Sequence, residues 1–441
     1  MTISFHDLSK MTRDERDALL KRTESDLTSY EEKVKPIIEA VRKEGDEALA
    51  RFARDFDKAP VQAGEIAATD ADFERAEKTL DPKVRKALEF AAASIRRFHE
   101  DQKPEEMWFH EIRPGVFAGD RTTPIPSVAC YVPRGKGAFP SAVMMTTIPA
   151  NVAGVADIAI ITPPGPDGKL DDATLVAARM SGVRKVFKAG GAQGIAAVAY
   201  GTQTVPKCAK VVGPGSPWVG AAKKLLSHVI DTGTPAGPSE LIVLADDTAD
   251  GKLAGLDLII ESEHGPDSSA FLVTWSRRVA EEAMAAIPGF WKQMGEQRVG
   301  YSSTVLGGKL GGVVLARDEE EAIAFCNDYA PEHLGVHSDE PFQYLGRLAN
   351  AGEILLGKHT PPTLGNFVIG VNHVLPTSGW AKTGSPLTVH DFMKRTSVAY
   401  VTGKGYPELA RHAEVIAKYE GFDGHANAVS GTRARLLGKN S

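Results

Sequence analysis

The sequence has little cysteine and no excess of positive charge, and each absence excludes a class of protein. Only three of its 441 residues are cysteines, and Cys130, Cys208 and Cys326 include no CxxC pair. That usage fits buried thiols in a reducing compartment better than a disulfide framework or a thiolate zinc site. The 51 lysines and arginines against 57 aspartates and glutamates give a formal net charge of −6. Because no basic excess is available to neutralise a phosphate backbone, nucleic-acid binding is not expected.

Long hydrophobic runs are also missing. No stretch approaches the roughly 18 consecutive apolar residues that suggest a membrane-spanning helix. The most apolar segments, such as VADIAIIT, have the length of a strand. The N-terminal segment MTISFHDLSKMTRDERDALL carries charges throughout and lacks the apolar core of a secretory signal. We therefore expect a cytoplasmic protein that does not associate with membranes.

Several common cofactor and catalytic signatures are absent as well. The chain has no P-loop, no GxSxG, no HExxH, and no GxGxxG that follows a strand and opens a helix. The run GGAQG at residues 190–194 does lie between an expected strand and an expected helix. Its backbone N–H groups could face a phosphate there, but such turns need glycine in any case. Both interpretations of this run stay open.

What the sequence does contain is a regular alternation of apolar strands and alanine-rich helices. From about residue 126, four apolar runs alternate with four helical segments. The runs are 128–132, 155–162, 183–189 and 209–213, and the helices are 142–152, 173–180, 192–200 and 219–228. Fully apolar strands separated by helices indicate a parallel sheet covered on both faces. A second alternation begins with the apolar run 241–245.

These two alternations predict an α/β protein with two doubly wound parallel-sheet domains. The predicted boundaries are a helical N-terminal arm at 1–24, a first domain of 25–125 plus 239–377, a second domain of 126–238 and a C-terminal tail at 378–441. The tail is expected to consist of helix and loop, because it shows no strand pattern. The loops that follow the strands of the second domain are candidate binding loops, since ligands of such folds lie at the carboxyl ends of strands.

Two carboxylate–imidazole pairs could carry chemistry. Glu261 and His264 end an apolar helical stretch and lie three positions apart, so their side chains share a face and could converge on a metal. The same pattern is typical of a charged helix end whose histidine interacts with the helix dipole. Glu332 and His333 follow a helix and a proline, and could form a general acid–base couple or an ordinary surface pair.

The C-terminal tail holds a further carboxylate and imidazole. Glu420 and His425 are five positions apart near the end of the chain. A tail that contributes ligands to a site would have to reach across to a partner subunit.

Eight segments, taken in order, resemble the bacterial histidinol dehydrogenase family. They are YVPRGKGAFPSAVMMTTIPANVAGV, FKAGGAQGIAAVAYGT, VVGPGSPWVGAAKKL, AGPSELIVLADDTAD, EHGPDS, DYAPEHL, NHVLPTSGWAKTGSPLTVHDFMKR and YEGFDGHANAV. The resemblance covers essentially the whole chain. It implies two Rossmann-like domains, a helical N-terminal arm, and a swapped C-terminal tail in a homodimer with shared active sites. It also implies one zinc per subunit and the oxidation of a primary alcohol through the aldehyde to the acid with two NAD.

The resemblance also implies roles for individual residues. The catalytic pair of the family falls on Glu332 and His333, and its metal ligands fall on Glu261, His264, Asn366 and His425. Its NAD contacts fall on Tyr131, Gln193 and Ser216. Its substrate contacts fall on Ser239, Glu261, His264, His333, Asn366, Glu420 and His425. In this scheme His333 accepts the alcohol proton and Glu332 activates water for attack on the aldehyde.

Three of these positions depart from the family pattern. Glu261 and Asn366 stand where the family has a glutamine and an aspartate zinc ligand, and Ser216 replaces the asparagine of its NAD-contacting GPGN. The first two exchanges compensate in charge, and both side chains keep an oxygen that can coordinate a divalent cation. We therefore expect a zinc site with its carboxylate moved to the opposite side. The competing expectation is a lost site in which Glu261 forms a salt bridge with a nearby base.

The resemblance implies the last oxidation of histidine biosynthesis, from L-histidinol to L-histidine. The exchanged ligand positions support an alternative, a paralogue that acts on another small polar alcohol such as an amino alcohol or a sulfonated diol. A non-catalytic homologue is a third alternative, and the intact catalytic pair and metal histidines argue against it.

Overall fold

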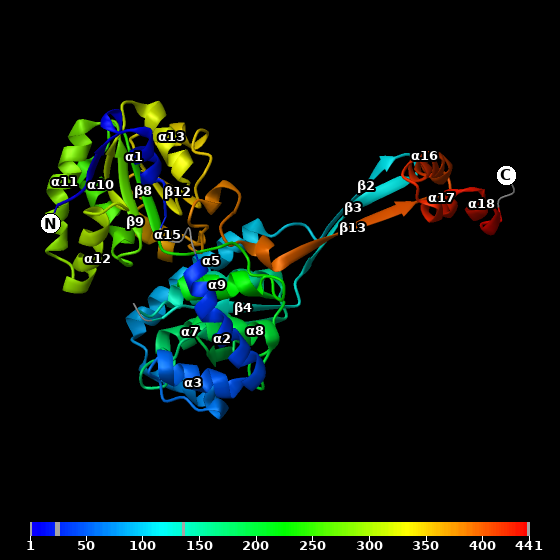
Figure 1. The fold of residues 1–441 in the computed structure, drawn as a ribbon, viewed down its shortest axis with the longest axis horizontal. Helices are drawn as coiled ribbons and strands as arrows, with labels where there is room; N and C mark the ends of the chain where they lie inside the picture. The colour runs from blue at the N-terminus through cyan, green and yellow to red at the C-terminus, as the bar shows by residue number, and fades with distance from the viewer. Residues whose placement is uncertain (1, 23–26, 135–136, 439–441) are drawn as a thin grey trace. The chain divides into compact units, whose positions relative to one another are not determined.

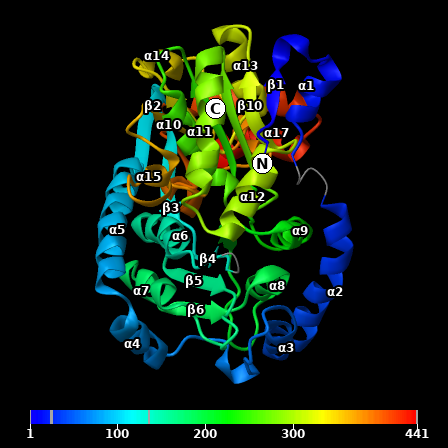
Figure 2. The ribbon, with the colours of Figure 1, turned by 90° about the vertical axis from the view of Figure 1, so that its left-hand side faces the viewer.

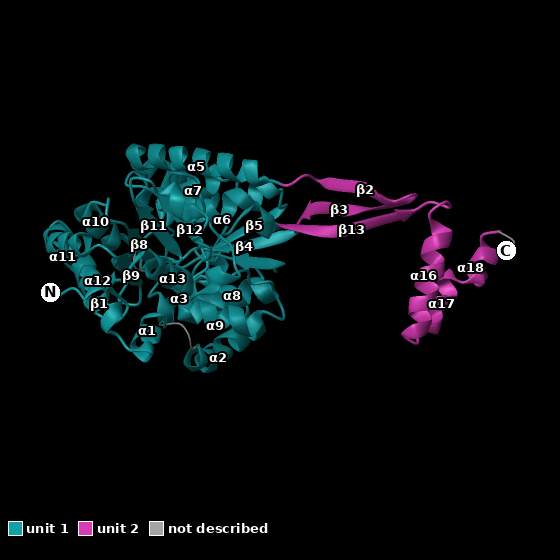
Figure 3. Ribbon diagram, turned by 90° about the horizontal axis from the view of Figure 1, so that it is seen from above, with its two compact units in different colours: residues 1–103, 125–392 teal, residues 104–124, 393–441 magenta. Residues whose placement is uncertain are grey.

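The computed structural model describes residues 2–22, 27–134 and 137–438. These residues form two compact units, shown in two colours in Figure 3. The larger unit comprises residues 1–103 and 125–392, and the smaller unit comprises residues 104–124 and 393–441.

The larger unit contains a six-stranded parallel sheet in the order β1-β10-β9-β8-β11-β12 (Figure 1). Its strands are β1 (Phe5–Asp7), β8 (Glu240–Ala245), β9 (Ser269–Thr274), β10 (Gly311–Leu315), β11 (His333–His337) and β12 (Glu353–Leu356). Leu241 and Val243 of β8 belong to one buried cluster, whereas Ile242 and Leu244 belong to another. Both faces of the sheet are therefore covered, which explains why residues 241–245 of β8 are apolar without interruption.

Helices from the same part of the chain cover the two faces. On one side lie α10 (Gly251–Ser262), α11 (Arg277–Trp291) and α12 (Glu296–Leu306), and on the other α1 (Arg13–Leu19), α13 (Glu319–Tyr329) and α14 (Phe342–Leu345). The short helix α15 (Pro362–Phe367) and the 3-10 helices Leu8–Lys10, Ala63–Glu65, Trp380–Lys382 and Val389–Phe392 complete the unit with the helices described below.

A four-stranded parallel sheet forms the other half of the larger unit, in the order β6-β5-β4-β7. Its elements are β4 (Ser127–Tyr131), α6 (Pro140–Ala153), β5 (Asp157–Thr162), α7 (Asp172–Met180), β6 (Lys185–Lys188), α8 (Gly191–Tyr200), β7 (Lys210–Val212) and α9 (Pro217–Leu226). Two parallel sheets flanked by helices confirm the predicted fold class. The strand order reverses between β4 and β7, which is the switch point of a doubly wound sheet.

The N-terminal helices pack around this four-stranded sheet. They are α2 (Thr28–Glu44), α3 (Asp46–Phe56), α4 (Asp70–Thr79) and α5 (Pro82–Gln102). Helix α2 contacts α8 and α9, whereas α5 contacts α6 and α7 on the opposite flank (Figure 2). This differs from the expectation that residues 25–125 join residues 239–377. The physical reason is that the apolar stripe of α2 shares a buried cluster with α8, while the six-stranded sheet already has its own covering helices.

The first residues also differ from the helical arm expected at 1–24. Helix α1 is present, but β1 precedes it and pairs with β10 at the edge of the six-stranded sheet. A three-residue strand is too short to show a periodic pattern in the sequence.

The smaller unit is an antiparallel sheet followed by helices. The sheet order is β13-β3-β2, with β2 (Met107–Arg113), β3 (Val116–Pro124) and β13 (Met393–Val401). The helices are α16 (Tyr406–Tyr419), α17 (Asp423–Val429) and α18 (Gly431–Leu436). The prediction of only helix and loop after residue 377 was therefore wrong. Strand β13 has no buried face, so it lacks the apolar alternation that marks a half-buried strand.

Across the described parts of the chain, no helix is both long enough and apolar enough to cross a membrane.

Candidate active site

Both predicted carboxylate–imidazole pairs lie at the amino edge of the six-stranded sheet. Glu332 and His333 stand at the start of β11, and Ser239 directly precedes β8. Glu261 lies in the last turn of α10, and His264 follows two residues after that helix ends. The structure thus brings together side chains that are far apart in the sequence.

Local sequence signals set the position of each element. Helix α10 begins at Asp250, whose carboxylate accepts the backbone N–H groups of Lys252 and Leu253. It ends at Ser262, shortly before Gly265-Pro266, because a proline disfavours the helical conformation of the residue that precedes it. Helix α13 ends at Ala330, which has a left-handed backbone with φ of 52°. This cap turns the chain into β11 and places Glu332 and His333 at the start of that strand.

Glu261 is fully buried at the centre of the site. Its Oε1 accepts a hydrogen bond of 2.7 Å from Nδ2 of Asn366, and its Oε2 lies 2.8 Å from Nδ1 of His264. The same Nδ1 is 2.7 Å from Oγ of Ser239. Burial opposes the charge of Glu261, but the neighbouring imidazoles of His264 and His333 hold the pKa of its carboxyl well below its usual value. The Glu261 carboxylate in turn raises the pKa of His264.

His333 lies among three carboxylates. Its Nδ1 is 2.6 Å from Oε1 of Glu353, while its Nε2 is 3.7 Å from Oε2 of Glu332 and 3.9 Å from Oε1 of Glu261. Burial opposes protonation, but the surrounding carboxylates outweigh it and raise the pKa of His333. Burial, together with the charge of Glu261, raises the pKa of Glu332. A raised carboxyl pKa beside a basic imidazole suits groups that hold and move a proton.

Glu353 is a site residue that the sequence did not reveal. It is twenty positions from His333 and meets it only because β11 and β12 pair in parallel, with His333 opposite Glu353. No local motif marks such a contact.

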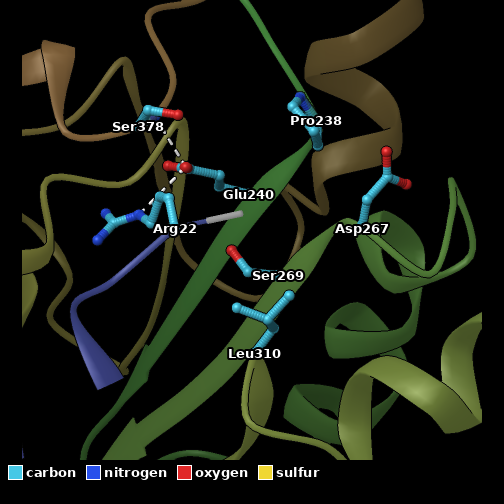
Figure 4. A pocket seen from close by; sticks show the side chains of 7 residues that line it. All are labelled: Arg22, Pro238, Glu240, Asp267, Ser269, Leu310 and Ser378. Carbon is cyan, nitrogen blue, oxygen red and sulfur yellow. Dashed lines mark hydrogen bonds and ion pairs between the residues drawn. The ribbon is translucent and has the colours of Figure 1, made fainter. Parts of the chain in front are cut away.

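A buried ion pair between Arg22 and Glu240 lies next to Glu332, and the sequence did not reveal it either. Arg22 Nε lies 3.2 Å from Oε1 of Glu240, and the backbone N–H of Ser378 donates to the same oxygen at 2.8 Å (Figure 4). The backbone N–H of Glu240 donates to Oε2 of Glu332 at 2.9 Å. The start of β8 therefore fixes one oxygen of the Glu332 carboxylate.

The donor groups around Glu261 bear on whether the site could hold a metal. Among the described residues, no group of three or more histidine, cysteine, aspartate or glutamate side chains is arranged to hold one. Glu261, His264 and Asn366 nevertheless lie together, and both oxygens of the buried Glu261 carboxylate face this group: Oε1 contacts the Asn366 amide and Oε2 contacts Nδ1 of His264. A carboxylate oxygen, an imidazole and an amide are suitable donors for zinc. In this structure Asn366 donates a hydrogen bond from its amide nitrogen to the Glu261 carboxylate.

The two predicted tail residues belong to the smaller unit. Glu420 caps the C-terminus of α16, and His425 lies in α17 with its ring 5.3 Å from that of Phe422. The other predicted metal and substrate residues belong to the larger unit.

The three predicted NAD residues lie at the carboxyl edge of the four-stranded sheet. Tyr131 ends β4, Gln193 lies in the first turn of α8, and Ser216 is the N-cap of α9. The Tyr131 hydroxyl accepts the backbone N–H of Gly191 at 3.2 Å. Ser216 makes no side-chain capping hydrogen bond, and its carbonyl accepts the backbone N–H groups of Val219 and Gly220 in the first turn of α9.

Comparisons with known proteins agree with this geometry. A family model described as "Histidinol dehydrogenase" matches residues 20–433. A Mesorhizobium japonicum protein named "Histidinol dehydrogenase homolog 2" is 60% identical over 435 residues, which is 99% of each chain. A Synechocystis protein named "Histidinol dehydrogenase" is 46% identical over 96% of this chain and 97% of its own.

Solved structures agree as well. The crystal structure of histidinol dehydrogenase from Elizabethkingia anophelis matches with a TM-score of 0.93 at 30% identity, over 99% of both chains. The chain therefore belongs to the histidinol dehydrogenase family and is a dehydrogenase of that type.

Proposed function

We propose that the protein oxidises a small primary alcohol through the aldehyde to the carboxylic acid, with L-histidinol and its product L-histidine as the first candidate. Two NAD accept the two hydrides, so that alcohol, water and two NAD⁺ give carboxylate, two NADH and three protons. The observation that carries this proposal is the acid–base group of Glu332 and His333 beside Glu261 and His264.

His333 is the proposed base for the alcohol proton. Its Nδ1 is occupied by Glu353, so Nε2 is the nitrogen that faces Glu332 and Glu261 and can accept a proton. Loss of that proton allows a hydride to leave the carbon for the nicotinamide. Glu332, held by the backbone of Glu240, then accepts a proton from the water that attacks the aldehyde.

One zinc per subunit completes the proposed site. Glu261, His264, Asn366 and the partner-donated His425 would hold it, and the buried Glu261 carboxylate, in contact with His264 and Asn366, supports a cation there. When bound, zinc polarises an alcohol oxygen and lowers its pKa. Ser239 and Glu420 are the further residues proposed to contact the substrate.

NAD is proposed to bind at the β4–β7 switch point. Ligands of doubly wound sheets lie where the strand order reverses, and Tyr131, Gln193 and Ser216 all lie at that edge. The N-terminus of α8 supplies N–H groups suited to a pyrophosphate.

The active molecule is proposed to be a homodimer in which each tail completes the partner's site. Large apolar side chains of the tail helices are exposed in the single chain, with Tyr419 at 93% and Leu436 at 83%. A partner subunit would cover such a surface.

A second candidate is a paralogue that oxidises a different small polar alcohol, either an amino alcohol or a sulfonated diol. The exchanged side chains at Glu261 and Asn366 favour it, because these positions are also proposed to contact the substrate. The names of related proteins also favour this second candidate. Four relatives at 58–60% identity are each named a histidinol dehydrogenase "homolog", whereas a relative named without that word is 46% identical.

A substrate panel with controlled zinc tests both candidates. L-histidinol, amino alcohols and sulfonated diols are incubated with NAD⁺ and the zinc-loaded protein, and NADH and product acid are measured. Two NADH per acid from L-histidinol supports the first candidate, and the same ratio from another alcohol alone supports the second. Absence of NADH from every alcohol, with zinc bound, contradicts the proposed function.

A further inference from the structure

We propose that Glu353 is a positioning residue that keeps the proton of the His333 imidazole on Nδ1 and so leaves Nε2 as the base. The inference rests on the proposed function in taking His333 as the proton acceptor. Glu353 itself has no role in the proposed zinc or substrate contacts.

Strand pairing fixes the two side chains together. His333 and Glu353 are partners in the parallel register of β11 and β12, and the backbone N–H of Glu353 donates to the carbonyl of Glu332 at 3.0 Å. Partners in register project their side chains from the same face of a sheet. The resulting distance of 2.6 Å between Nδ1 and Oε1 is that of a charge-assisted hydrogen bond.

The Glu353 carboxylate is buried, where a charged group is unfavourable unless it is well hydrogen-bonded. The Glu353 side chain is 8% exposed, and its Oε2 is buried with no hydrogen-bond partner among the residues described. A buried carboxylate with so few donors is costly, which argues against a purely structural role. Gly365 leaves space for it, because a Cβ there would lie only 3.1 Å from Oε1 and 3.2 Å from Oε2.

The contact selects one tautomer of His333. A carboxylate can only accept, and a neutral imidazole has one N–H, so a hydrogen bond to Glu353 places that proton on Nδ1. Without Glu353, the carboxylates of Glu332 and Glu261 on the other side would favour a proton on Nε2. An imidazole with its proton on Nε2 cannot accept one there from the alcohol.

The chain offers a matched control on the same strand. His337, at the far end of β11, pairs its Nε2 with Oδ2 of Asp257 at 2.9 Å, and both residues are buried. The four positions between the two histidines correspond to about 13 Å along a strand. Asp257→Asn therefore neutralises a comparable pair outside the proposed machinery.

The first measurement is the tautomer of His333 in the wild-type protein. The chain has 12 histidines, so ¹⁵N-histidine spectra are recorded and His333 is assigned by its loss in His333→Gln. The spectra are recorded at rising pH until the His333 imidazole is neutral, and a proton on Nδ1 in that neutral form supports the proposal. A proton on Nε2 alone overturns it, whatever the activity of the protein.

The second measurement compares the variants. Glu353→Gln is expected to lower kcat by about 100-fold, with KM and zinc content close to wild type and the proton of His333 moved toward Nε2. Asp257→Asn is expected to keep kcat and the His333 signal. An unchanged kcat in a folded Glu353→Gln overturns the proposal while leaving the proposed function intact. If Glu353→Gln does not fold, the wild-type spectrum still decides.

Discussion

At the residue scale, Glu261 is the group around which the polar side chains of the site are arranged. Its two oxygens meet an amide from α15 and an imidazole that follows α10, and it has no exposed surface. The contact of Oε2 with His264 agrees with the salt-bridge expectation, and the convergence of Glu261, His264 and Asn366 agrees with a cation site. These two expectations make different predictions for a neutral side chain at this position.

Glu261→Gln is predicted to lower zinc affinity at least about tenfold, because this change leaves the proposed ligand set without a carboxylate. Zinc per chain is measured by elemental analysis after dialysis against increasing chelator. The matched control is the double variant Glu261→Gln/Asn366→Asp, which restores the charge at the neighbouring position and should recover zinc. Equal zinc in wild type and Glu261→Gln, or no zinc in wild type, would contradict the metal proposal.

At the element scale, the end of β7 determines how closely this edge strand of the four-stranded sheet approaches its neighbour β4. Gly213 has a φ of 111°, and a Cβ there would lie 2.1 Å from the carbonyl oxygen of Tyr131. Only glycine adopts this conformation without strain, so the residue is required at the switch point. The turn that follows leads to Ser216 and α9.

Gly213→Ala is predicted to displace the end of β4 and raise the KM for NAD about tenfold or more, with a smaller change in kcat. Steady-state kinetics at saturating alcohol measure this. Gly300→Ala is the control, since Gly300 lies in α12 with nothing within 4 Å of an added Cβ. It should leave the KM unchanged. A Gly213→Ala protein that is folded and has the wild-type KM would place NAD elsewhere.

At the scale of the whole molecule, the proposed ligands are divided between two compact units. The larger unit holds Glu261, His264 and Asn366, and the smaller unit holds His425. Exposed apolar side chains on the tail helices favour docking on a second copy of the chain. A homodimer with swapped tails would have two shared sites, each built from both subunits.

Mixing two inactive variants tests this arrangement. His333→Ala and His425→Ala chains are predicted to regain activity when combined, because one site of each mixed dimer has both residues intact. Random mixing makes half of the dimers mixed, so about a quarter of wild-type activity is expected. Tagged subunits confirm that mixed dimers form. No recovery in purified mixed dimers would show that each chain completes its own site.

The sequence by itself determined the strand–helix alternation of the four-stranded sheet, the first strand of the second alternation, and the carboxylate–imidazole pairs that are close in the chain. Strands buried on both faces must be apolar throughout, and side chains three positions apart on a helix share a face, so these features are local. Family motifs supplied the positions of the catalytic pair and the tail histidine, which no local pattern assigns.

Only the tertiary structure decided which elements meet. The packing of α2 and α5 on the four-stranded sheet, the pairing of β1 with β10, and the exposed strand β13 depend on partners distant in the chain. Glu353 became a neighbour of His333 through strand pairing alone. The physical reason is that the hydrophobic pattern of an element shows which of its faces is buried. It does not show which other element covers that face, because the partner is chosen by contacts between residues far apart in the sequence.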